Sequence, residues 1–501
     1  MAIYEYFYLD MFTLRTTIIY LYLFNSFFLA VFSFLVVLFF IFKQYYCLIT
    51  NEGLKKYILI IIALLCLVHV LNMVLYIRYY NLNYMLSNSK QFGSNINYCI
   101  GFSAYSYNIS IDFFSLILIF LAFMIGFISL IVLDIRIQNK YINYYLSFFL
   151  FMFIVHCFVS CTNFLLCFLF YELLLLPSFF FVYFLSTYRR SIIASLYFVV
   201  WTQIGSLLVF SGIIYIYIIT NTLSFNELYT YIFTASEKSL LYLIFFIGFG
   251  IKIPIWPFHY WLTKTHVEAP SGFSIYLSGF LVKSALYGFY KFTFMLSYGI
   301  LTYLYIAIII FGIIDASLKM WGQTDLKKLV AYATIQEMNL IFLIFNWGDS
   351  NGILYGICFC FTHAFLSALM FFLVDCIYRR FYTRSIVELH GIFHICPLLA
   401  VGIFFMLVLF SGIPGTMKFI SEFYVYLSLL ETAPILCFLT MFFVNFIGLV
   451  GFSKSWFNSM FGLNLKYFIV IPLDLSKKDI YIYICSSIFL IIGNFSLYLM
   501  L

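Results

Sequence analysis

Residues 246–258 read FIGFGIKIPIWPF, an apolar run in which Lys252 and two prolines interrupt a stretch suited to lipid. Three further apolar runs also contain a charged residue, acidic or basic: Glu172 in LFYELLLLPSFFF, Lys283 in SGFLVKSALYGF and Glu422 in GTMKFISEFYVYL. An ionised side chain at mid-bilayer depth costs about 2.5–3.5 kcal/mol on insertion scales. A chain that keeps carboxylates and amines at this depth is expected to use them, and the combination favours a proton path.

The composition is that of an integral membrane protein. Of the 501 residues, 65% are hydrophobic and 9% are charged, whereas soluble domains carry about 25% charged residues. About fourteen apolar runs reach the roughly 20 residues that a membrane-spanning helix needs. We therefore expect an all-α polytopic membrane protein with about fourteen transmembrane helices. The excess of Phe (67) and Tyr (44) is typical of proteins from AT-rich genomes, such as those of many mitochondria.

The distribution of Lys and Arg predicts the topology. Eighteen of the 26 basic residues fall in odd-numbered loops and four fall in even-numbered loops. By the positive-inside rule, the odd loops face the side of synthesis and both termini face the opposite side. This bias accounts for most of the net charge of +7, and no basic block of the nucleic-acid-binding type is present. The N-terminal stretch MAIYEYFYLDMF has no basic region, so we expect neither a signal nor a transit peptide.

Two spans are interrupted by closely spaced proline and glycine. The seventh carries KIPIWP at 252–257, and the twelfth carries SGIPGT at 411–416. Broken segments at matching positions of two halves point to inverted-repeat transporters. Glu172 precedes Pro254 by 82 residues, and Glu337 precedes Pro414 by 77. We therefore expect two inverted five-helix repeats with broken helices 7 and 12; the alternative is that ordinary proline kinks coincide by chance.

This pattern divides the chain into four regions. They are the first two transmembrane helices with a polar loop (1–110), helix 3 with the first repeat of helices 4–8 (111–295), the second repeat of helices 9–13 (296–455), and a loop with helix 14 (456–501).

Buried charges along these spans form the candidate site. Glu172 and Lys252 are expected to pair and to exchange ionised and neutral forms; a static salt bridge is the alternative. Lys283 lies too far from either end of its span to snorkel, so a polar interior is expected around it. Glu337, His363 and Glu422 continue the series, and Lys418 shares a helix face with Glu422.

Four further polar residues have simpler interpretations. Asp325 is expected to cap the N-terminus of the tenth span. His266 and Glu268, in KTHVEAPSG, are expected in a loop and in contact with water. His259 follows the break in the seventh span, where it could receive a proton from Lys252 or cap a freed backbone group.

Several of these stretches resemble the chain 4 family of respiratory complex I, the proton-translocating NADH:ubiquinone oxidoreductase. The most specific is residues 251–291, which contain the loop HVEAP and the following LVK. The others occur in the family order and are ISIDFFSL around Asp112, FYELLLLPS, QTDLKKLVAYATIQEM, THAFLSALMFFLVDCIYRRFYTRS and GIPGTMKFISEF. The resemblance covers roughly residues 105 to 455.

The resemblance implies an antiporter-like subunit of the membrane arm in the mitochondrial inner membrane. It implies no redox centre, cofactor or metal in this chain, with flavin and iron–sulfur clusters in partner subunits. Implied partners are the paralogous antiporter-like chains 2 and 5 and lipids such as cardiolipin, and no nucleic acid. The proton path implied by motif match consists of Glu172, Lys252, Lys283, His363 and Glu422 on spans five, seven, eight, eleven and twelve.

Two positions depart from the family pattern. Glu337 stands where the family usually has histidine, and we expect it to pair more tightly with Lys283 than a histidine would. Lys418 stands where a neutral side chain is usual, and it either tunes Glu422 or compensates for its charge.

Two rival functions use the same residues. A stand-alone cation/proton antiporter subunit would need the same buried charges. A passive scaffold would use them only to hold helices together, and replacing Lys252 by Met would then leave proton pumping intact.

Overall fold

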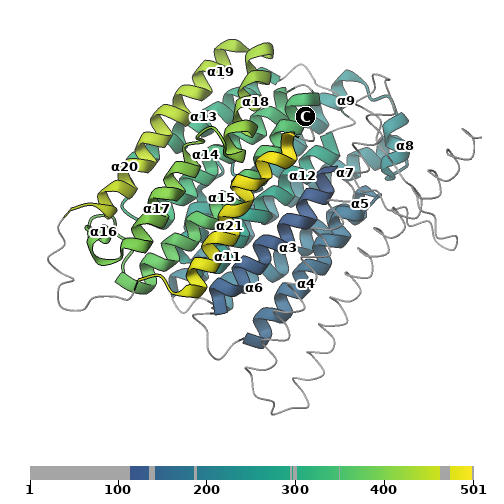
Figure 1. Ribbon diagram of the computed structural model, residues 1–501. Helices are drawn as coiled ribbons and strands as arrows, with labels where there is room; N and C mark the ends of the chain where they lie inside the picture. The colour runs from purple at the N-terminus through teal and green to yellow at the C-terminus, as the bar shows by residue number, and fades with distance from the viewer. Residues whose placement is uncertain are drawn as a thin grey trace, which may run out of the picture.

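The computed structural model describes residues 113–134, 141–185, 189–293, 296, 302–348, 350–462 and 474–498. Within these ranges the protein is a bundle of long helices, most of which run along a common direction (Figure 1). Extended pairing in the described residues is limited to two isolated bridges, Asn163–Ser224 and Asp325–Ser385. The first two expected spans and the polar loop before residue 110 lie outside the described residues.

The expected third to fourteenth spans all fall on described elements. Two of these elements, η1 and η2, are π-helical. In chain order the elements are α3 (Phe113–Asp134), α4 (Tyr141–Ser160), α5 (Phe164–Leu173), α6 (Leu175–Leu185), α7 (Arg189–Thr220), α8 (Phe225–Thr230), α9 (Ala235–Lys252), α10 (Tyr260–Glu268), α11 (Ser271–Tyr276), η1 (Leu277–Leu281), α12 (Val282–Thr293), α13 (Thr302–Trp321), α14 (Leu326–Trp347), α15 (Ser350–Phe381), α16 (Ile392–Ile395), α17 (Pro397–Phe410), α18 (Met417–Thr432), α19 (Pro434–Met441), η2 (Phe442–Gly448), α20 (Leu449–Met460) and α21 (Lys477–Tyr498).

The membrane-spanning character of the bundle is confirmed. In the described part of the chain, seven helices are long and apolar enough to cross a membrane. The predicted breaks divide other expected spans into shorter helices, and the count of fourteen stays a prediction.

The break in the seventh span lies where the sequence predicts it. Helix α9 ends before Pro254 and α10 begins after Pro257, because proline has no backbone donor and clashes with the preceding turn. The indole of Trp261 donates a hydrogen bond to the carbonyl of Ile251 (2.8 Å), and the amide of Asn339 donates to the carbonyl of Pro254 (3.2 Å). Protein groups rather than lipid therefore satisfy the freed backbone, as a membrane interior requires.

The twelfth span breaks in the same way between α17 and α18. Gly412 and Gly415 have φ values of +67° and +98°, a conformation that a residue without Cβ adopts at low cost. The carbonyl of Phe410, at the end of α17, accepts a hydrogen bond from the Lys418 ammonium at 2.6 Å. The break between α17 and α18 thus places the buried Lys418 side chain at the C-terminal end of α17.

The span that follows each break contains a π-helical segment. η1 lies in the eighth expected span and η2 in the thirteenth, which are equivalent positions in the two predicted repeats. Segments of π-helix are rare and are frequent at functional sites. The match of a break followed by a π segment supports the internal repeat independently of the proline spacing.

The charged residues of the second half are carried by the innermost helices. The apolar windows of α14 and α15 are each 94% buried, whereas those of α7 and of residues 434–460 are 39% and 33% buried. Helix α14 packs between α13 and α15, and α15 also contacts α18. Side chains that point inward from α14, α15 and α18 therefore meet away from lipid.

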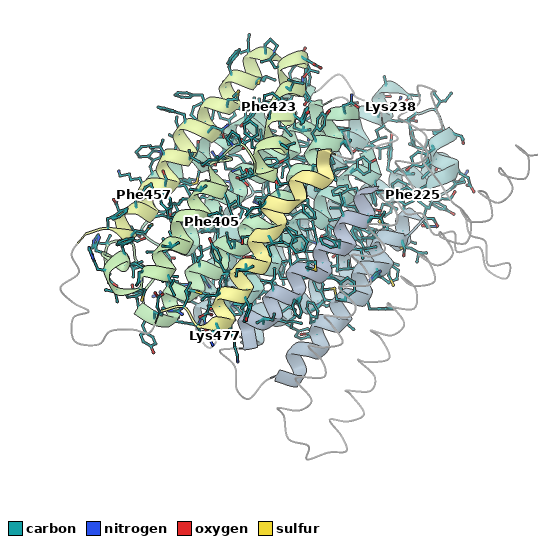
Figure 2. All side chains as sticks on the ribbon, in the orientation of Figure 1. Phe225, Lys238, Phe405, Phe423, Phe457 and Lys477 are labelled. Carbon is teal, nitrogen blue, oxygen red and sulfur yellow. The ribbon has the colours of Figure 1, made fainter. Side chains whose placement is uncertain are left out.

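The two ends of the bundle agree with the predicted topology. Lys238, in an even-numbered loop, and Lys477, in an odd-numbered loop, lie at opposite ends of the bundle (Figure 2). Phe423 and Phe457 are 51% and 37% exposed, so aromatic side chains line the outer surface between these ends. An apolar lateral surface with charged ends is the pattern of a protein that spans a bilayer.

Candidate functional site

A row of four ionisable side chains runs from α12, near the end of the first predicted repeat, into the second repeat. Lys283 on α12 places its Nζ 2.6 Å from Nδ1 of His363 on α15. The other ring nitrogen, Nε2, lies 3.8 Å from Oε2 of Glu337 on α14. Glu337 Oε1 lies 2.6 Å from Nζ of Lys418 on α18. All four residues are buried, with relative exposures of 0%, 3%, 1% and 4% along the row.

Lys283 is held by the π-helical segment that precedes it. Its ammonium donates to the carbonyl of Ser278 at 2.5 Å, in addition to its contact with His363. A buried ammonium needs such acceptors because it leaves water behind. The prediction of a polar interior around Lys283 is therefore met by a carbonyl and an imidazole.

Glu337 has a different partner from the one that the sequence suggested. The expectation that it pairs with Lys283 is wrong: His363 lies between the two, and the Glu337 carboxylate binds Lys418 directly. The physical reason is the break before α18, which brings Lys418 into the core at the level of α14. Lys418 also lies 4.0 Å from the centre of the Phe410 ring.

Glu422 lies one turn beyond Lys418 on α18 and is 7% exposed. Within the described residues, its Oε1 accepts no hydrogen bond. The polar groups that approach the carboxyl are Tyr426, one turn further along, and Asn445 on η2. The predicted shared face of Lys418 and Glu422 is thus inside the bundle, yet the lysine contacts Glu337.

The first half of the bundle carries the predicted Glu172 and Lys252, which interact electrostatically but form no direct ion pair. Both are described, and no ion pair within 4.0 Å joins them. Glu172 Oε2 accepts a hydrogen bond from the Gln203 amide at 3.0 Å. The Lys252 ammonium lies 3.7 Å from the centre of the Tyr171 ring, a cation–π contact. The structure therefore shows the two charges apart, each with a partner of its own.

His259 neither contacts Lys252 directly nor caps the freed backbone. Its Nε2 lies 3.2 Å from Asp315 Oδ2 on α13, and Lys319 Nζ lies 2.7 Å from the same oxygen. It precedes α10 without a side-chain capping bond. Both sequence-based roles are replaced by a cluster with α13, because the break turns the histidine toward that helix.

The expectation that His266 and Glu268 lie in a hydrated loop is wrong. Both belong to the last turns of α10, and Pro270 follows the helix end. His266 is fully buried and stacks on Phe371 at 4.7 Å, whereas Glu268 is half-buried. The short polar run KTHVEAPSG suggested a loop, but its first part completes the second half of the broken span.

Asp325 is confirmed as an N-cap. Its carboxylate accepts from the backbone N–H of Lys327 at 2.8 Å, at the start of α14. It also lies 3.6 Å from Arg384. The residue therefore anchors the helix that carries Glu337.

Two polar partners of the candidate residues were not predicted from the sequence. Gln203 on α7 donates to Glu172, and Asp315 on α13 lies beside His259. Apart from small hydroxyl residues, each is the one polar side chain of an otherwise apolar run, VVWTQIGSLLVF and FGIIDASL. An isolated amide or carboxylate in a lipid-length run is the signal that could have revealed both.

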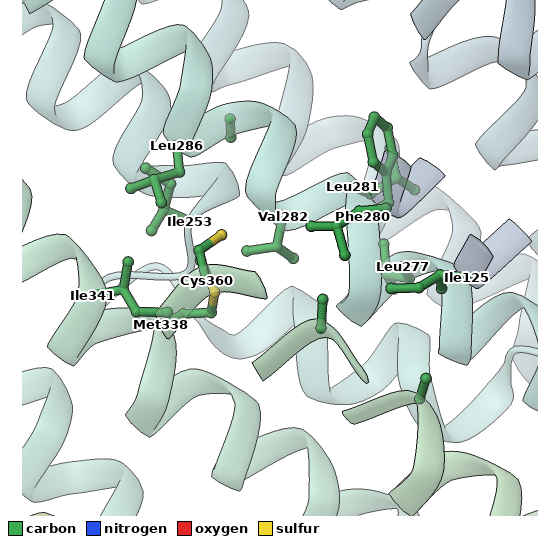
Figure 3. Packing of buried hydrophobic residues seen from close by; sticks show 14 of the residues in the cluster. Ile125, Ile253, Leu277, Phe280, Leu281, Val282, Leu286, Met338, Ile341 and Cys360 are labelled. Atoms are coloured by element: carbon green, nitrogen blue, oxygen red, sulfur yellow. The ribbon is translucent and has the colours of Figure 1, made fainter. Parts of the chain in front are cut away.

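Apolar side chains pack together among the elements that carry Lys283, His363 and Glu337. Figure 3 shows Ile253, Val282, Leu286, Met338 and Cys360 converging from the first break and from α12, α14 and α15. Each is at most 5% exposed. Such packing keeps bulk water away and strengthens the interactions among the charges within it.

Broken spans beside a buried row of lysine, histidine and glutamate define an antiporter-like membrane protein. A family model described as NADH:quinone oxidoreductase/Mrp antiporter, transmembrane region, matches residues 161–448. NADH-ubiquinone oxidoreductase chain 4 of Paramecium tetraurelia is 46% identical over 379 residues, which are 75% of this chain and 80% of that protein. The chain belongs to this family and, within it, to the NADH-ubiquinone oxidoreductase chain 4 group.

Other comparisons agree on the family and the fold. Chain 4 of Chondrus crispus is 31% identical over 393 residues, covering 77% of this chain and 79% of the relative. A subunit of respiratory complex I from Thermus thermophilus superimposes with a TM-score of 0.69 at 21% identity, covering 77% of this chain and 81% of that one. A subunit of the Mrp complex from a Dietzia species gives a TM-score of 0.68 at 18% identity, covering 77% and 43% of the two chains. These structural likenesses show the fold.

Proposed function

We propose that this chain is a proton-translocating membrane-arm subunit of respiratory complex I. The single observation that carries the proposal is the buried row from Lys283 through His363 and Glu337 to Lys418, with two contacts at 2.6 Å and one separation of 3.8 Å. Each member can bind and release a proton, and each lies in a region that excludes bulk water. The chain 4 relatives and the antiporter-like fold support the same function.

The spacing of the row divides it into fixed contacts and one adjustable gap. Proton transfer needs heavy atoms within about 2.6–3.2 Å, or one water between them. The contacts at 2.6 Å meet this condition, whereas the 3.8 Å between His363 and Glu337 does not. A rotation of either side chain, or one water, closes the gap. This contact is therefore where conformational change can permit or stop proton movement.

The separation between Lys252 and Glu172 in the first half would control proton movement along the row. When Lys252 leaves Tyr171 and approaches Glu172, its positive charge moves away from the interior row; the reverse movement restores it. A shift of this kind alters the electrostatic potential at Lys283 through a medium of low dielectric constant. Electron transfer in other subunits would thus reach this chain as a change in the Glu172–Lys252 separation.

The partners and surroundings follow from the same assignment. We place the chain in the mitochondrial inner membrane, beside other membrane-arm subunits that include the paralogous chains 2 and 5, with lipids such as cardiolipin at its apolar surface. We assign no redox centre to this chain and place flavin and iron–sulfur clusters in partner subunits. The two five-helix repeats, helices 4–8 within residues 111–295 and helices 9–13 in residues 296–455, would each contribute one half of the proton path.

The cation/proton antiporter subunit is the less supported function. The Mrp subunit shares the fold at 18% identity, whereas chain 4 relatives share 31% and 46% of their residues with this chain. Purification separates the two functions. Co-isolation with flavin and iron–sulfur subunits supports complex I, and isolation with antiporter subunits alone would contradict it.

Replacing Lys283 by Met tests the pumping role. The intact enzyme, reconstituted in vesicles, should move fewer protons per NADH oxidised than the wild type. Lys291→Met is a matched control, because Lys291 is a buried lysine on the same helix that faces aromatic rings of Phe225 and Tyr287. Undiminished pumping in Lys283→Met, or an equal loss in both variants, would contradict the proposal.

A further inference from the structure

Lys418 occupies a position between two buried carboxyl groups. Its ammonium has three N–H donors, of which one binds Glu337 Oε1 and another the Phe410 carbonyl, both at 2.6 Å. Glu422 follows four residues later, and side chains with that spacing on a helix are neighbours. In the structure Lys418 binds Glu337, and the Glu422 carboxyl lies one helical turn away on the same face of α18.

Glu422 is set up to receive a cation. It is 7% exposed, and in the described residues its Oε1 accepts no hydrogen bond. An ionised carboxylate buried in this way is costly unless a cation or further donors stabilise it, and Lys418, Asn445 and Tyr426 are the groups near this carboxyl. Asn445 approaches from η2, and this amide is exposed at the outer surface between Phe442 and Phe446.

Gly412 leaves open the space that joins the two groups. A Cβ placed on Gly412 would lie 3.5 Å from Glu422 Oε2 and 3.8 Å from Lys418 Cγ. The Lys418 stem and the Glu422 carboxyl therefore lie on either side of the same point beside Gly412. In the proposal below, rotation of the Lys418 side chain about the bonds beyond Cγ moves the ammonium from Glu337 toward Glu422.

We propose that Lys418 is a proton-carrying switch that alternates between Glu337 and Glu422. This inference rests on the proposed pumping function and adds the step that follows Glu337. The proposed cycle starts with Lys418 as an ammonium paired with ionised Glu337 and with Glu422 protonated.

One cycle moves one proton. A proton arriving from His363 neutralises Glu337 and frees Lys418, whose ammonium rotates to Glu422 and stabilises its ionised form; the Glu422 O–H bond breaks and its proton passes to water on the exit side. Lys418 then gives one N–H proton to Glu422, forming an O–H bond, and returns as a neutral amine. It takes the proton of Glu337 and restores the starting pair. One proton has entered at Glu337 and one has left at Glu422.

Arginine at position 418 separates a switch from a permanent counter-ion. A guanidinium keeps the charge next to Glu337 but does not give up its proton in proteins. In vesicles containing the intact enzyme, Lys418→Arg should lower the protons moved per NADH to the level of Glu422→Gln, and the double variant should lose no more than either single one. If Lys418→Arg pumps like the wild type, Lys418 is a fixed counter-ion and the proposal is overturned.

Infrared difference spectra separate a proton-carrying role of Lys418 from a purely structural one, because a structural role would not change the C=O band of Glu422 during turnover. The C=O stretch of protonated Glu422, assigned by its absence in Glu422→Gln, should disappear and return during NADH-driven turnover. It should stay constant in Lys418→Arg. A constant band in the wild-type enzyme would overturn the proposal.

The space beside Gly412 can be tested with a matched glycine. Gly412→Ala places a methyl group in van der Waals contact with both Glu422 and the Lys418 stem, which leaves less room for the lysine to rotate, whereas Gly415→Ala in the same break, also at positive φ, meets no atom within 4 Å. Both changes strain the backbone, so the difference between them reports the blocked route, and pumping should fall further in Gly412→Ala. Equal pumping in the two variants would contradict the route.

These outcomes are distinguishable from a failure of the proposed function. If Lys283→Met lowers pumping and Lys418→Arg does not, the subunit pumps without the switch. If neither change lowers pumping, the proposed function itself fails.

Discussion

The ammonium nitrogen of Lys283 lies 2.6 Å from Nδ1 of His363. An ammonium can only donate, so Nδ1 must accept, and the ring is neutral with its proton on Nε2. That nitrogen faces Glu337 Oε2 at 3.8 Å. The imidazole is therefore oriented to pass its Nε2 proton to Glu337 and to take another from Lys283, which gives the row a direction.

Replacing His363 by Gln should interrupt the row. The amide can hydrogen-bond to Lys283 but cannot accept a proton on one side and release one on the other. We expect fewer protons per NADH in reconstituted vesicles, with a stability loss of about 1–3 kcal/mol from imperfectly satisfied buried groups. Wild-type pumping in this variant would show that protons bypass the histidine.

Replacing Glu337 by Gln should both destabilise the enzyme and reduce pumping. The change leaves the Lys418 ammonium buried without its carboxylate, and breaking a buried pair by removing one partner costs about 3–5 kcal/mol. The double variant Glu337→Gln/Lys418→Met removes the orphaned charge and should regain thermal stability without regaining pumping. A double variant no more stable than Glu337→Gln would argue against the pair.

Asp315→Asn should have a small effect on stability. The side chains of Asp315 and Lys319 are 26% and 43% exposed, and ion pairs of this kind contribute less than about 1 kcal/mol. The thermal midpoint of the purified enzyme should move little compared with that of Glu337→Gln. A shift as large as that of Glu337→Gln would mean that His259 depends on Asp315 far more than its partial exposure indicates.

Asp479→Asn should loosen the last helix. Arg379 and Arg380 of α15 each donate to the Asp479 carboxylate at 2.9 Å, and its side chain is 1% exposed. Losing the charge leaves Arg380 without a carboxylate partner, whereas Arg379 keeps Asp375 at 2.8 Å, so the cost should lie at or below the roughly 3–5 kcal/mol of a broken buried pair. Limited proteolysis near residues 463–476 should accelerate, and an unchanged cleavage rate would contradict this attachment.

Asp325 allows a test of capping without charge. Asp325→Ala removes the N-cap of α14, which costs about 1 kcal/mol, whereas Asn caps about as well as Asp. Thermal stability should therefore fall in Asp325→Ala and largely persist in Asp325→Asn. Equal losses in both variants would indicate that the contact with Arg384 dominates.

Local sequence patterns were sufficient to predict where the two spans break and which charged side chains are buried. Closely spaced Pro and Gly interrupt α-helices by covalent geometry, so the ends of α9 and α17 could be read directly. The burial of Lys283 and Glu422 followed from their distance to the span ends. Such features depend on residues within a few turns of each other.

The partner of Glu337 could not be read in the same way. Glu337 and its partner Lys418 are 81 residues apart in the sequence, and their contact depends on how α18 is rotated after the break. The π-helical segments were equally invisible, since a local change from α to π geometry leaves no distinct apolar periodicity. The prediction that His266 lies in a loop was wrong for a simpler reason. A short polar run before Pro270 is compatible with a loop and with the final turn of a helix.

Glu172 is partly exposed on α5, among Leu165, Leu169 and Leu176, which are 36–50% exposed. A solitary copy of this chain would present that carboxylate to hydrocarbon, where its ionised form is intolerable. We therefore expect unassembled copies to be less stable in the bilayer than assembled ones. The abundance of this chain in a cell should follow the supply of whichever neighbour covers that face.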